Sequence, residues 1–485
     1  MSDPLGHTAD MGTRERPVSA VATTGIYCRP ECGARPNPEN VAAFSSPVAA
    51  EAAGYRSCLR CRPDRHLTVA PATGVPPAVA SALGLISAGY LDRFDEQALA
   101  DRVGYSTRQL RRLFELHVGA TPAFVARSRR AHFARRLLDE TDLPMPAVAG
   151  AAGFGSVRQM NRVVAGIFRF SPTALRDKRR ERDVLVVDGG LRLRLPFVEP
   201  LDRRAALDHL EPRVTPGVEA VIGSTYRRTL EVCGNPGVIE VVLAGSEAHM
   251  ELTAHLPTFD SIIDDVARIR SMFGLDDDVA AAESRLGADP LLGPLVRRRP
   301  GLRVIGGWDR FEVAVRVIVG QQISVPGATT ITARIVERHG RALPGSALGL
   351  DRLFPTPDAL RALDPVGLGM PGRRVATIRA LAEAVLDGSL DLGADPETVR
   401  RGLLGLPGIG PWTADVIMMR AVRDPDAFPS SDLGIRHAVR ALLGRDEPPP
   451  AAEVEALADA WRPHRALAAQ HLWSALRTGS TRETP

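Results

Sequence analysis

The stretch Leu404-Gly-Leu-Pro-Gly-Ile-Gly-Pro-Trp-Thr-Ala414 decides the fold of the C-terminal part of this chain. An apolar helix end leads into a glycine-rich hairpin, and Pro411 begins a new helix, where proline is well tolerated. Glycines at such a point let backbone N–H groups at a helix N-terminus approach a phosphate closely. We therefore expect Gly408 and Gly410 to form a phosphate-binding hairpin.

A carboxylate follows this hairpin in the stretch Phe428-Pro-Ser-Ser-Asp432-Leu-Gly-Ile-Arg. Judged by residue type alone, Asp432 is a helix N-cap, because Ser and Asp commonly precede an apolar-periodic run. Together, however, the two stretches resemble the signature of the helix-hairpin-helix glycosylase superfamily. The resemblance implies that Asp432 is the catalytic residue.

Further motifs narrow this resemblance to AlkA-type 3-methyladenine DNA glycosylases over residues 185–480. These motifs are Trp308-Asp-Arg-Phe-Glu, Val319-Gly-Gln-Gln-Ile-Ser-Val325, Leu368-Gly-Met-Pro-Gly-Arg373 and Gln470-His-Leu-Trp473. The resemblance implies hydrolysis of the N-glycosidic bond of an alkylated base that has been flipped out of the duplex. Such a base is cationic and leaves readily, so one carboxylate suits the task of stabilising the charge that grows on the sugar.

Trp412 occupies the position where lyase-type relatives carry a catalytic lysine. The only lysine of the chain is Lys178. We therefore expect base removal without strand cleavage and without a cofactor. An indole face attracts a cationic base, so Trp412 is expected to line the pocket, whereas Trp461 and Trp473 are expected to lie in the core.

Two departures from the AlkA pattern bear on the substrate. Val416 stands where well-known AlkA-type enzymes place an aromatic residue. The tip after Gly320 is Gln321-Gln322, where an apolar wedge can occur. We expect Gln322 to contact DNA and the substrate range to differ accordingly.

The segment before the helical part alternates between strand and helix patterns. The runs VLVVDG, LRLRLPF, AVIGSTYRRTLEV and GVIEVVLAG within residues 184–245 are typical of strands, and helical patterns interleave at 200–210 and 258–273. These patterns predict an α+β domain with an antiparallel sheet. From residue 291 onward the pattern predicts an all-α domain.

An internal repeat lies in the helical segment 80–176, which has no convincing strand pattern. Arg108-Gln-Leu recurs as Arg158-Gln-Met, and Gly104-Tyr and Gly153-Phe precede the two copies. A long helix over 127–136 is expected between them. Both copies resemble the paired helix-turn-helix units of AraC-type regulators.

In such units the second helix enters the major groove of DNA. By position, the expected base readers are Arg108 and Gln109 in the first unit and Arg158, Gln159 and Asn161 in the second, while Arg111, Arg112 and Arg162 are better placed for phosphates. Residues 77–183 carry 18 basic and 11 acidic side chains, an excess of +7 that exceeds the whole-chain charge of +4. Because a single arginine on a helix is usually a solvated surface residue, this evidence supports DNA binding by the segment as a whole and does not assign a role to each arginine.

Four of the five cysteines form the pairs Cys28-Arg-Pro-Glu-Cys32 and Cys58-Leu-Arg-Cys61. Paired close spacings of this kind are typical of a tetrahedral Zn²⁺ site. The site is either purely structural or reactive. The surrounding TTGIYCRPEC, ENVAAF and AGYRSCLRCRPDR resemble, over residues 23–65, the N-terminal domain of Ada, the methyl-phosphotriester acceptor.

That resemblance implies that Cys28 takes a methyl group irreversibly while Cys32, Cys58 and Cys61 remain zinc ligands. Methylation changes the charge of the zinc-thiolate centre from −2 to −1, which should raise its affinity for DNA. The stretch before Thr23 does not match the usual opening strand of the family. The fifth cysteine, Cys233, lacks the sequence setting of an O6-methylguanine acceptor, so that activity is not expected.

The length and composition of the chain limit the number of domains and the class of protein that we expect. A chain of 485 residues is too long for one core, and 44% hydrophobic with 24% charged residues is typical of a soluble globular protein. The N-terminus has no apolar signal segment and no stretch of 18 apolar residues occurs, so we expect a cytoplasmic protein without a membrane partner. The expected domains are a zinc-thiolate module (1–75), a double helix-turn-helix (76–182), an α+β domain (183–290) and a helix-hairpin-helix domain (291–485).

Taken together, the resemblances predict a methylation-sensitive transcription regulator fused to a repair glycosylase. The expected partner is double-stranded DNA, at alkylated sites and at a promoter operator, and an activator role implies RNA polymerase as a further partner. The alternative is a transcription factor whose glycosylase-like domain has reduced or altered specificity. The arginine bias, with 60 of 61 basic residues being arginine, suits nucleic-acid binding but equally reflects a genome-wide composition.

Overall fold

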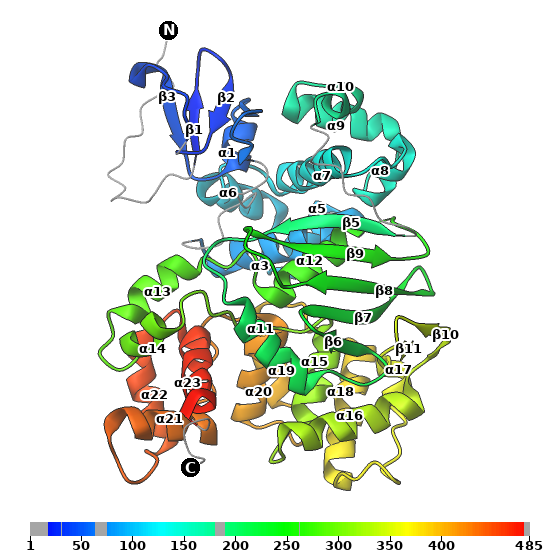
Figure 1. Cartoon of the computed structure of the whole chain (residues 1–485), viewed down its shortest axis with the longest axis vertical. Coiled ribbons are helices and arrows are strands. Elements are labelled where there is room, and N and C mark those ends of the chain that lie inside the picture. The colour runs from blue at the N-terminus through cyan, green and yellow to red at the C-terminus, as the bar shows by residue number, and fades with distance from the viewer. Residues whose placement is uncertain (1–17, 31, 64–74, 180–189, 261, 480–485) are drawn as a thin grey trace. The chain divides into compact units, whose positions relative to one another are not determined.

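The computed structural model describes residues 18–30, 32–63, 75–179, 190–260 and 262–479 (Figure 1). Contacts within the chain group these residues into two compact units, the first made of residues up to 136 and 154–178, the second of 137–153 and 179 onward. The finer division into four domains remains a prediction.

The first unit begins with a four-stranded sheet. Its order is β3-β1-β2-β4, with β2 and β4 parallel and the other pairs antiparallel. The elements are β1 (Val18–Val21), β2 (Ile26–Cys28), the 3-10 helix η1 (Pro38–Asn40), β3 (Val41–Phe44), α1 (Pro47–Ala52) and β4 (Arg56–Ser57). By its motifs alone, the stretch before Thr23 does not match the usual opening strand of the family, but it forms β1 inside the sheet, with Val18 and Ala20 fully buried. A strand of four residues is too short for its alternation to be recognised.

Helices make up the rest of the first unit, as predicted. They are α3 (Pro77–Ser87), α4 (Tyr90–Arg93), α5 (Glu96–Arg102), α6 (Thr107–His117), α7 (Pro122–Glu140), whose last four residues belong to the second unit, α9 (Val157–Phe168) and α10 (Pro172–Asp177). The long helix expected between the two repeats is α7. Gly104 makes the turn between α5 and α6 with φ +76°, a conformation that favours glycine.

The zinc module and the first helix-turn-helix share one hydrophobic core. Val48 of α1 belongs to the same buried cluster as Leu99, Leu110 and Phe114. An added Cβ at Gly119 would lie 2.7 Å from the Cβ of Ala49, so only glycine allows this close approach of α1. The sheet that carries the cysteines is therefore held firmly against the helices.

In the second unit, a five-stranded antiparallel sheet of order β5-β9-β8-β7-β6 confirms the predicted α+β part. Helix α12 packs on this sheet through an edge-to-face contact of Tyr226 and Phe273 with centroids 6.0 Å apart. The elements are α8 (Met145–Ala151), β5 (Leu191–Pro196), α11 (Arg203–Leu210), η3 (Glu211–Arg213), β6 (Glu219–Ile222), β7 (Thr225–Val232), β8 (Asn235–Val242), β9 (His249–His255) and α12 (Ile262–Phe273).

The remaining part of the second unit is helical around one large buried cluster. Its helices are α13 (Val279–Gly287), α14 (Gly293–Arg298), α15 (Arg310–Val319), α16 (Val325–His339), α17 (Pro357–Leu360), α18 (Gly372–Leu386), α19 (Pro396–Leu404), α20 (Pro411–Ile417), the π-helical η4 (Met418–Val422), α21 (Leu433–Leu443), α22 (Ala451–Ala458), η5 (Asp459–Trp461) and α23 (Arg465–Gly479). The all-α expectation missed one short hairpin, β10 (Ala342–Ala347) with β11 (Leu350–Arg352). Local pairing across the turn at Leu348-Gly349 builds this hairpin, and its strands are too short for a clear alternation.

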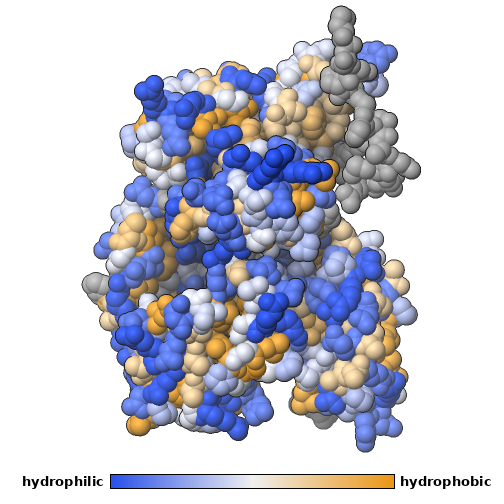
Figure 2. Space-filling model, turned by 180° about the vertical axis from the view of Figure 1, so that it is seen from behind, coloured by the Kyte–Doolittle hydropathy of each residue, from blue (hydrophilic) through white to orange (hydrophobic). Residues whose placement is uncertain are grey.

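The surface of the face in Figure 2 intersperses hydrophilic residues with small groups of hydrophobic ones. Among the described residues, no helix combines the length and apolarity that crossing a bilayer requires.

Candidate functional sites

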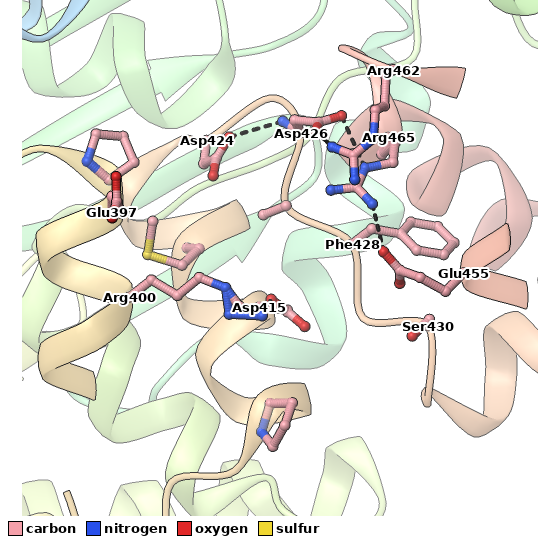
Figure 3. Close-up of a pocket in the computed structure, with 14 residues that line it drawn as sticks. Glu397, Arg400, Asp415, Asp424, Asp426, Phe428, Ser430, Glu455, Arg462 and Arg465 are labelled. Carbon is pink, nitrogen blue, oxygen red and sulfur yellow. Dashed lines mark hydrogen bonds and ion pairs between the residues drawn. The ribbon is translucent and has the colours of Figure 1, made fainter. Parts of the chain in front are cut away.

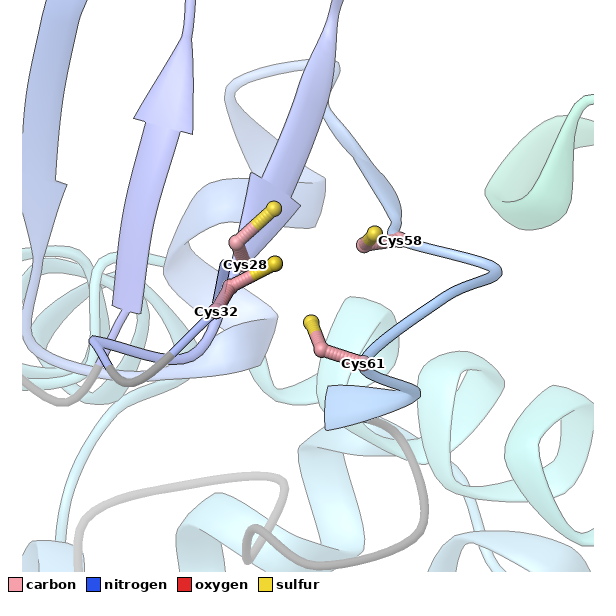
Figure 4. A group of neighbouring side chains, drawn as sticks. All are labelled: Cys28, Cys32, Cys58 and Cys61. Carbon is pink, nitrogen blue, oxygen red and sulfur yellow. The ribbon is translucent and has the colours of Figure 1, made fainter. Parts of the chain in front are cut away.

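The four cysteines predicted to bind zinc converge at one end of the small sheet (Figure 4). Cys28 ends β2 and Cys58 follows β4, and because these strands are parallel neighbours, both cysteine pairs emerge at the same edge. The N–H of Cys58 donates to the carbonyl of Tyr27 at 3.0 Å, which fixes the two segments to each other. The four sulfur atoms lie within 4.8 Å of one another.

This arrangement fits a tetrahedral zinc site. A Zn–S bond of about 2.3 Å implies sulfur–sulfur distances of roughly 3.8 Å. Burial and the neighbouring Cys58 raise the pKa of Cys28 well above its ordinary value, and burial raises the pKa of Cys61 to about 11. These two thiols would keep their protons near neutral pH unless a cation bound to the cluster, whereas backbone hydrogen bonds from Cys61 and Arg60 lower the pKa of Cys58 despite its burial. The donor set and its electrostatics therefore both fit Zn²⁺.

Helix α6 carries the expected base readers of the first helix-turn-helix. Ser106 caps the helix in a capping box with Gln109, whose side-chain oxygen accepts from the N–H and the hydroxyl of Ser106 at 3.1 and 2.8 Å. Arg111 forms a bidentate ion pair with Glu96 at 2.9 and 2.8 Å, and both Arg108 and Arg111 are exposed. Gln109 thus has a local structural role, and Arg108 is the better placed of the two expected readers.

The corresponding helix of the second repeat, α9, has Ser156 as its N-cap. Arg158, Asn161 and Arg162 are exposed at i, i+3 and i+4, so they share one face of the helix. Gln159 instead accepts the N–H of Gly155 at 2.9 Å through its side-chain oxygen. As in the first repeat, the glutamine supports the start of the helix while the arginine beside it faces outward.

In the second unit, Asp432 is the N-cap of α21 and also the acceptor of two indole groups. Its Oδ1 accepts the N–H of Ile435 at 3.0 Å and Nε1–H of Trp473 at 2.8 Å. Its Oδ2 accepts Nε1–H of Trp412 at 2.9 Å. The side chains of Asp432, Trp412 and Trp473 are all partly exposed. The two interpretations of Asp432, cap or site residue, are therefore compatible.

The contact of Trp473 with Asp432 was not predicted from the sequence. We expected Trp473 in the core with Trp461, which is indeed buried at 1% exposure. Trp473 instead lies partly exposed beside Asp432, with the guanidinium of Arg420 5.4 Å from its ring centroid. Its presence in the motif Gln470-His-Leu-Trp473 was the available signal. Val416, which stands where AlkA-type enzymes place an aromatic residue, is buried.

The glycine-rich hairpin adjoins the Gln321-Gln322 tip. Gln321 donates through Nε2 to the carbonyl of Gly408 at 3.0 Å and to the hydroxyl of Thr413 at 2.9 Å. Gly408 has φ +82°, and a Cβ there would lie 2.1 Å from the Thr377 hydroxyl oxygen, so this position requires glycine. Gln322 is exposed with φ +56°, unusual for a residue with a side chain.

A polar cavity of about 710 Å³ lies in the same helical part, with Pro411 and Ser430 among its lining residues (Figure 3). Arg465 bonds to Asp426 and Glu455 at 2.9 and 2.6 Å on its wall, and burial raises the pKa of Asp415 to about 6. Neither Asp432 nor Trp412 lines this cavity. Its volume is therefore no evidence for a base-binding pocket, and the indole contacts of Asp432 remain the better guide.

Comparison with family models gives four matches along the chain. They are the metal binding domain of Ada at residues 8–64, a helix-turn-helix domain at 99–178, the AlkA N-terminal domain at 192–309, and the HhH-GPD superfamily base excision DNA repair protein at 315–463. The Ada match includes the region before Thr23, in agreement with strand β1.

Individual proteins give the same picture. The chain is 33% identical over 287 residues to DNA-3-methyladenine glycosylase 2 of Escherichia coli, covering 58% of this chain and 95% of that protein. The solved 3-methyladenine DNA-glycosylase from Archaeoglobus fulgidus matches with a TM-score of 0.52 at 23% identity over 60% of this chain and 99% of that one, which supports the fold.

The comparison that spans the chain is with a Mycobacterium tuberculosis protein named "Probable bifunctional transcriptional activator/DNA repair enzyme AlkA". It is 40% identical over 464 residues, which cover 95% of this chain and 92% of the relative. Since the likeness extends through both units and agrees with all four family models, the chain belongs to the family of bifunctional transcriptional activator/DNA repair enzymes of the AlkA type.

Proposed function

We propose that the second unit excises 3-methyladenine-type bases from DNA and that Asp432 is its catalytic residue. The observation that carries this proposal is the position of the Asp432 carboxylate between two partly exposed indole rings. A cationic base is attracted to the faces of such rings. The carboxylate beside them stabilises the positive charge that develops on the sugar as the glycosidic bond breaks.

The two oxygens of Asp432 differ in what remains available for the reaction. Oδ1 already accepts two N–H groups, from Ile435 and Trp473, which occupies both of its lone pairs. Within the described part of the chain, Oδ2 accepts a hydrogen bond only from the Trp412 indole. We assign Oδ2 as the oxygen that faces the sugar or orients the attacking water, and Trp473 as a residue that positions the carboxylate through Oδ1.

DNA would be held around this site by the hairpin and the adjoining tip. The N–H groups at Gly408 and Gly410 precede α20 and suit a backbone phosphate. Gln322, exposed at the tip that Gln321 ties to the hairpin, would contact the bases beside the extruded nucleotide. Since Lys178 is the only lysine of the chain and precedes this domain, excision should leave the strand uncut.

The first unit is proposed to accept a methyl group at Cys28 and to bind an operator. The thiolate sulfur attacks the methyl carbon of a methylated DNA phosphate; the C–O bond breaks, and its electron pair stays on the phosphate oxygen. Bound Zn²⁺ would keep the four cysteines as thiolates near neutral pH. Arg108, Arg158, Asn161 and Arg162 are exposed for DNA contact, while Gln109 and Gln159 would need to leave their capping bonds to read bases.

One experiment tests both activities. The full chain is incubated with DNA carrying radiolabelled methyl groups, and released bases and protein-bound methyl are assayed separately. We expect labelled 3-methyladenine in the soluble fraction, one methyl group on Cys28, and intact strands until abasic sites are cleaved by alkali. Protein-bound methyl without released base would contradict the glycosylase, and released base without bound methyl would contradict the acceptor. An operator-binding protein that does neither would support the alternative, a transcription factor with an altered glycosylase-like domain.

A further inference from the structure

The first unit contains a buried carboxylate outside the zinc site. Glu51, at the end of α1, has a side chain that is only 1% exposed. Its Oε1 lies 2.7 Å from the Tyr27 hydroxyl and 2.6 Å from Nε2 of His132, and its Oε2 lies 2.5 Å from the Ser128 hydroxyl. A carboxylate only accepts hydrogen bonds when ionised, so three donors converge on it. Burying a charged group costs free energy unless hydrogen-bond donors surround it, so these contacts fix the position of α1.

The three donors come from two different parts of the unit. Tyr27 directly precedes Cys28 in β2, and it is fully buried. Ser128 and His132 are four residues apart on α7 and therefore lie on one face of that helix. Glu51 thus joins the strand of the proposed methyl acceptor to the helix that connects the two helix-turn-helix units.

From α7 the contacts continue to the second recognition helix. The ring of His132 meets the ring of Phe168 edge-on, with centroids 5.1 Å apart and an interplanar angle of 74°. Phe168 is the last residue of α9 and is 3% exposed. A continuous series of contacts, buried except at the partly buried His132, therefore runs from Tyr27 through Glu51 and His132 to the helix that carries Arg158 and Arg162.

A second contact region connects the other cysteine pair with the same helix end. Arg169 donates through Nη2 to the carbonyl of Gly54 at 3.2 Å. The guanidinium of Arg56 lies 5.6 Å from the ring centroid of Phe170. Arg56 is in β4, two residues before Cys58. The end of α9 is thus held by the zinc module on two sides.

We propose that Glu51 couples the methylation state of Cys28 to the position of α9. This inference rests on the proposed methyl acceptance. Cys28 is 8% exposed, so a thioether methyl group must displace its surroundings, and the fully buried Tyr27 beside it moves with the strand. That movement changes the bond from the Tyr27 hydroxyl to Glu51 and, through the carboxylate, the placement of His132 against Phe168. A switch based on charge alone would not need Glu51.

The test uses the full zinc-loaded chain and Glu51→Gln, which keeps the shape of the side chain and removes its charge. Cys28 is methylated with methyl iodide, and peptide mass identifies the modified cysteine. Hydrogen exchange of residues 122–136 and 157–168 is measured before and after methylation. In wild type we expect exchange at the end of α9 to change by about threefold or more. In Glu51→Gln we expect Cys28 methylation to proceed and α9 exchange to stay constant.

Two further variants keep the test decisive. Glu39→Gln removes an exposed carboxylate from the same module and should behave as wild type. If Glu51→Gln loses its zinc, Tyr27→Phe removes only the hydroxyl donor and should uncouple α9 in the same way. An unchanged α9 in methylated wild type, or an equal change in wild type and in folded Glu51 or Tyr27 variants, overturns the proposal. Failure of methyl transfer from DNA is measured separately and would contradict only the proposed acceptor function.

Discussion

Replacing Asp432 by Asn separates catalysis from helix capping at one side chain. Asn caps helices about as well as Asp, so the bond to the N–H of Ile435 should survive. The amide has one oxygen where the carboxylate had two, and the N–H groups of Ile435, Trp412 and Trp473 all point to this side chain. The amide nitrogen must therefore face one of the two indole N–H groups. One unsatisfied donor at a partly exposed site should cost about 1 kcal/mol, the lower end of the usual range.

The effect on the reaction should be much larger than the effect on stability. A carboxylate that faces a developing cation in a water-poor site contributes about 3 kcal/mol, which corresponds to roughly two orders of magnitude in rate. We expect single-turnover excision of 3-methyladenine to slow by that factor or more in Asp432→Asn. DNA affinity, measured by fluorescence anisotropy, should hold or rise, because a negative charge has been removed.

Asp289 provides a matched control within the same unit. Its Oδ1 accepts the N–H groups of Leu291 and Leu292, each at 2.9 Å, and its Oδ2 accepts Nε1–H of Trp461 at 3.0 Å. Asp289→Asn therefore removes the same charge from a carboxylate with one indole and two backbone donors. It should lower stability comparably and leave excision unchanged. Near wild-type excision by Asp432→Asn, or an equal loss in both variants, would refute the catalytic assignment.

Three further perturbations test the other assignments. Trp473→Phe keeps an aromatic ring but removes the N–H donor to Oδ1 of Asp432, so the excision rates of cationic and neutral bases should both fall by about tenfold. A role in stacking alone would instead lower the excision of cationic bases more. The control Trp461→Phe should lower only the stability of the protein. Elemental analysis should find one zinc per chain near neutral pH, and Cys32→Ser should lose the metal and unfold the small module, while a metal-free, folded wild type would contradict the site. At one fixed salt concentration, Arg158→Ala should relax operator specificity and Arg162→Ala should weaken binding to all sequences alike; identical effects of both would contradict their separate roles.

Local signals in the sequence predicted much of this structure. The internal repeat predicted two similar helical units, and Arg108 and Arg158 lie in the corresponding first turns of α6 and α9. Each of these features depends on residues within a few positions of each other. The cysteine spacing likewise predicted a cluster that the parallel pairing of β2 with β4 brings together.

Contacts between distant segments could not be predicted in the same way. Trp473 meets Asp432 across 41 positions, and Glu51 meets Ser128 across 77. A tryptophan on an apolar helix face is compatible both with the core and with the edge of a site, and only packing decides between them. Glu51 lies in an alanine-rich helix whose pattern does not indicate that its carboxylate is buried.

The pair Asp432 and Asp289 shows why hydrogen bonding alone does not identify a catalytic carboxylate. Both accept at least one indole N–H and at least one backbone N–H at nearly the same distances. They differ in the rings around them, because Trp461 beside Asp289 is buried at 1% exposure, whereas Trp412 and Trp473 beside Asp432 are partly exposed. A flipped base can reach an exposed indole face but not one enclosed in the core. The exposure of both indoles, together with the adjoining glycine-rich hairpin, is therefore the feature that favours Asp432 over Asp289 in the proposed chemistry.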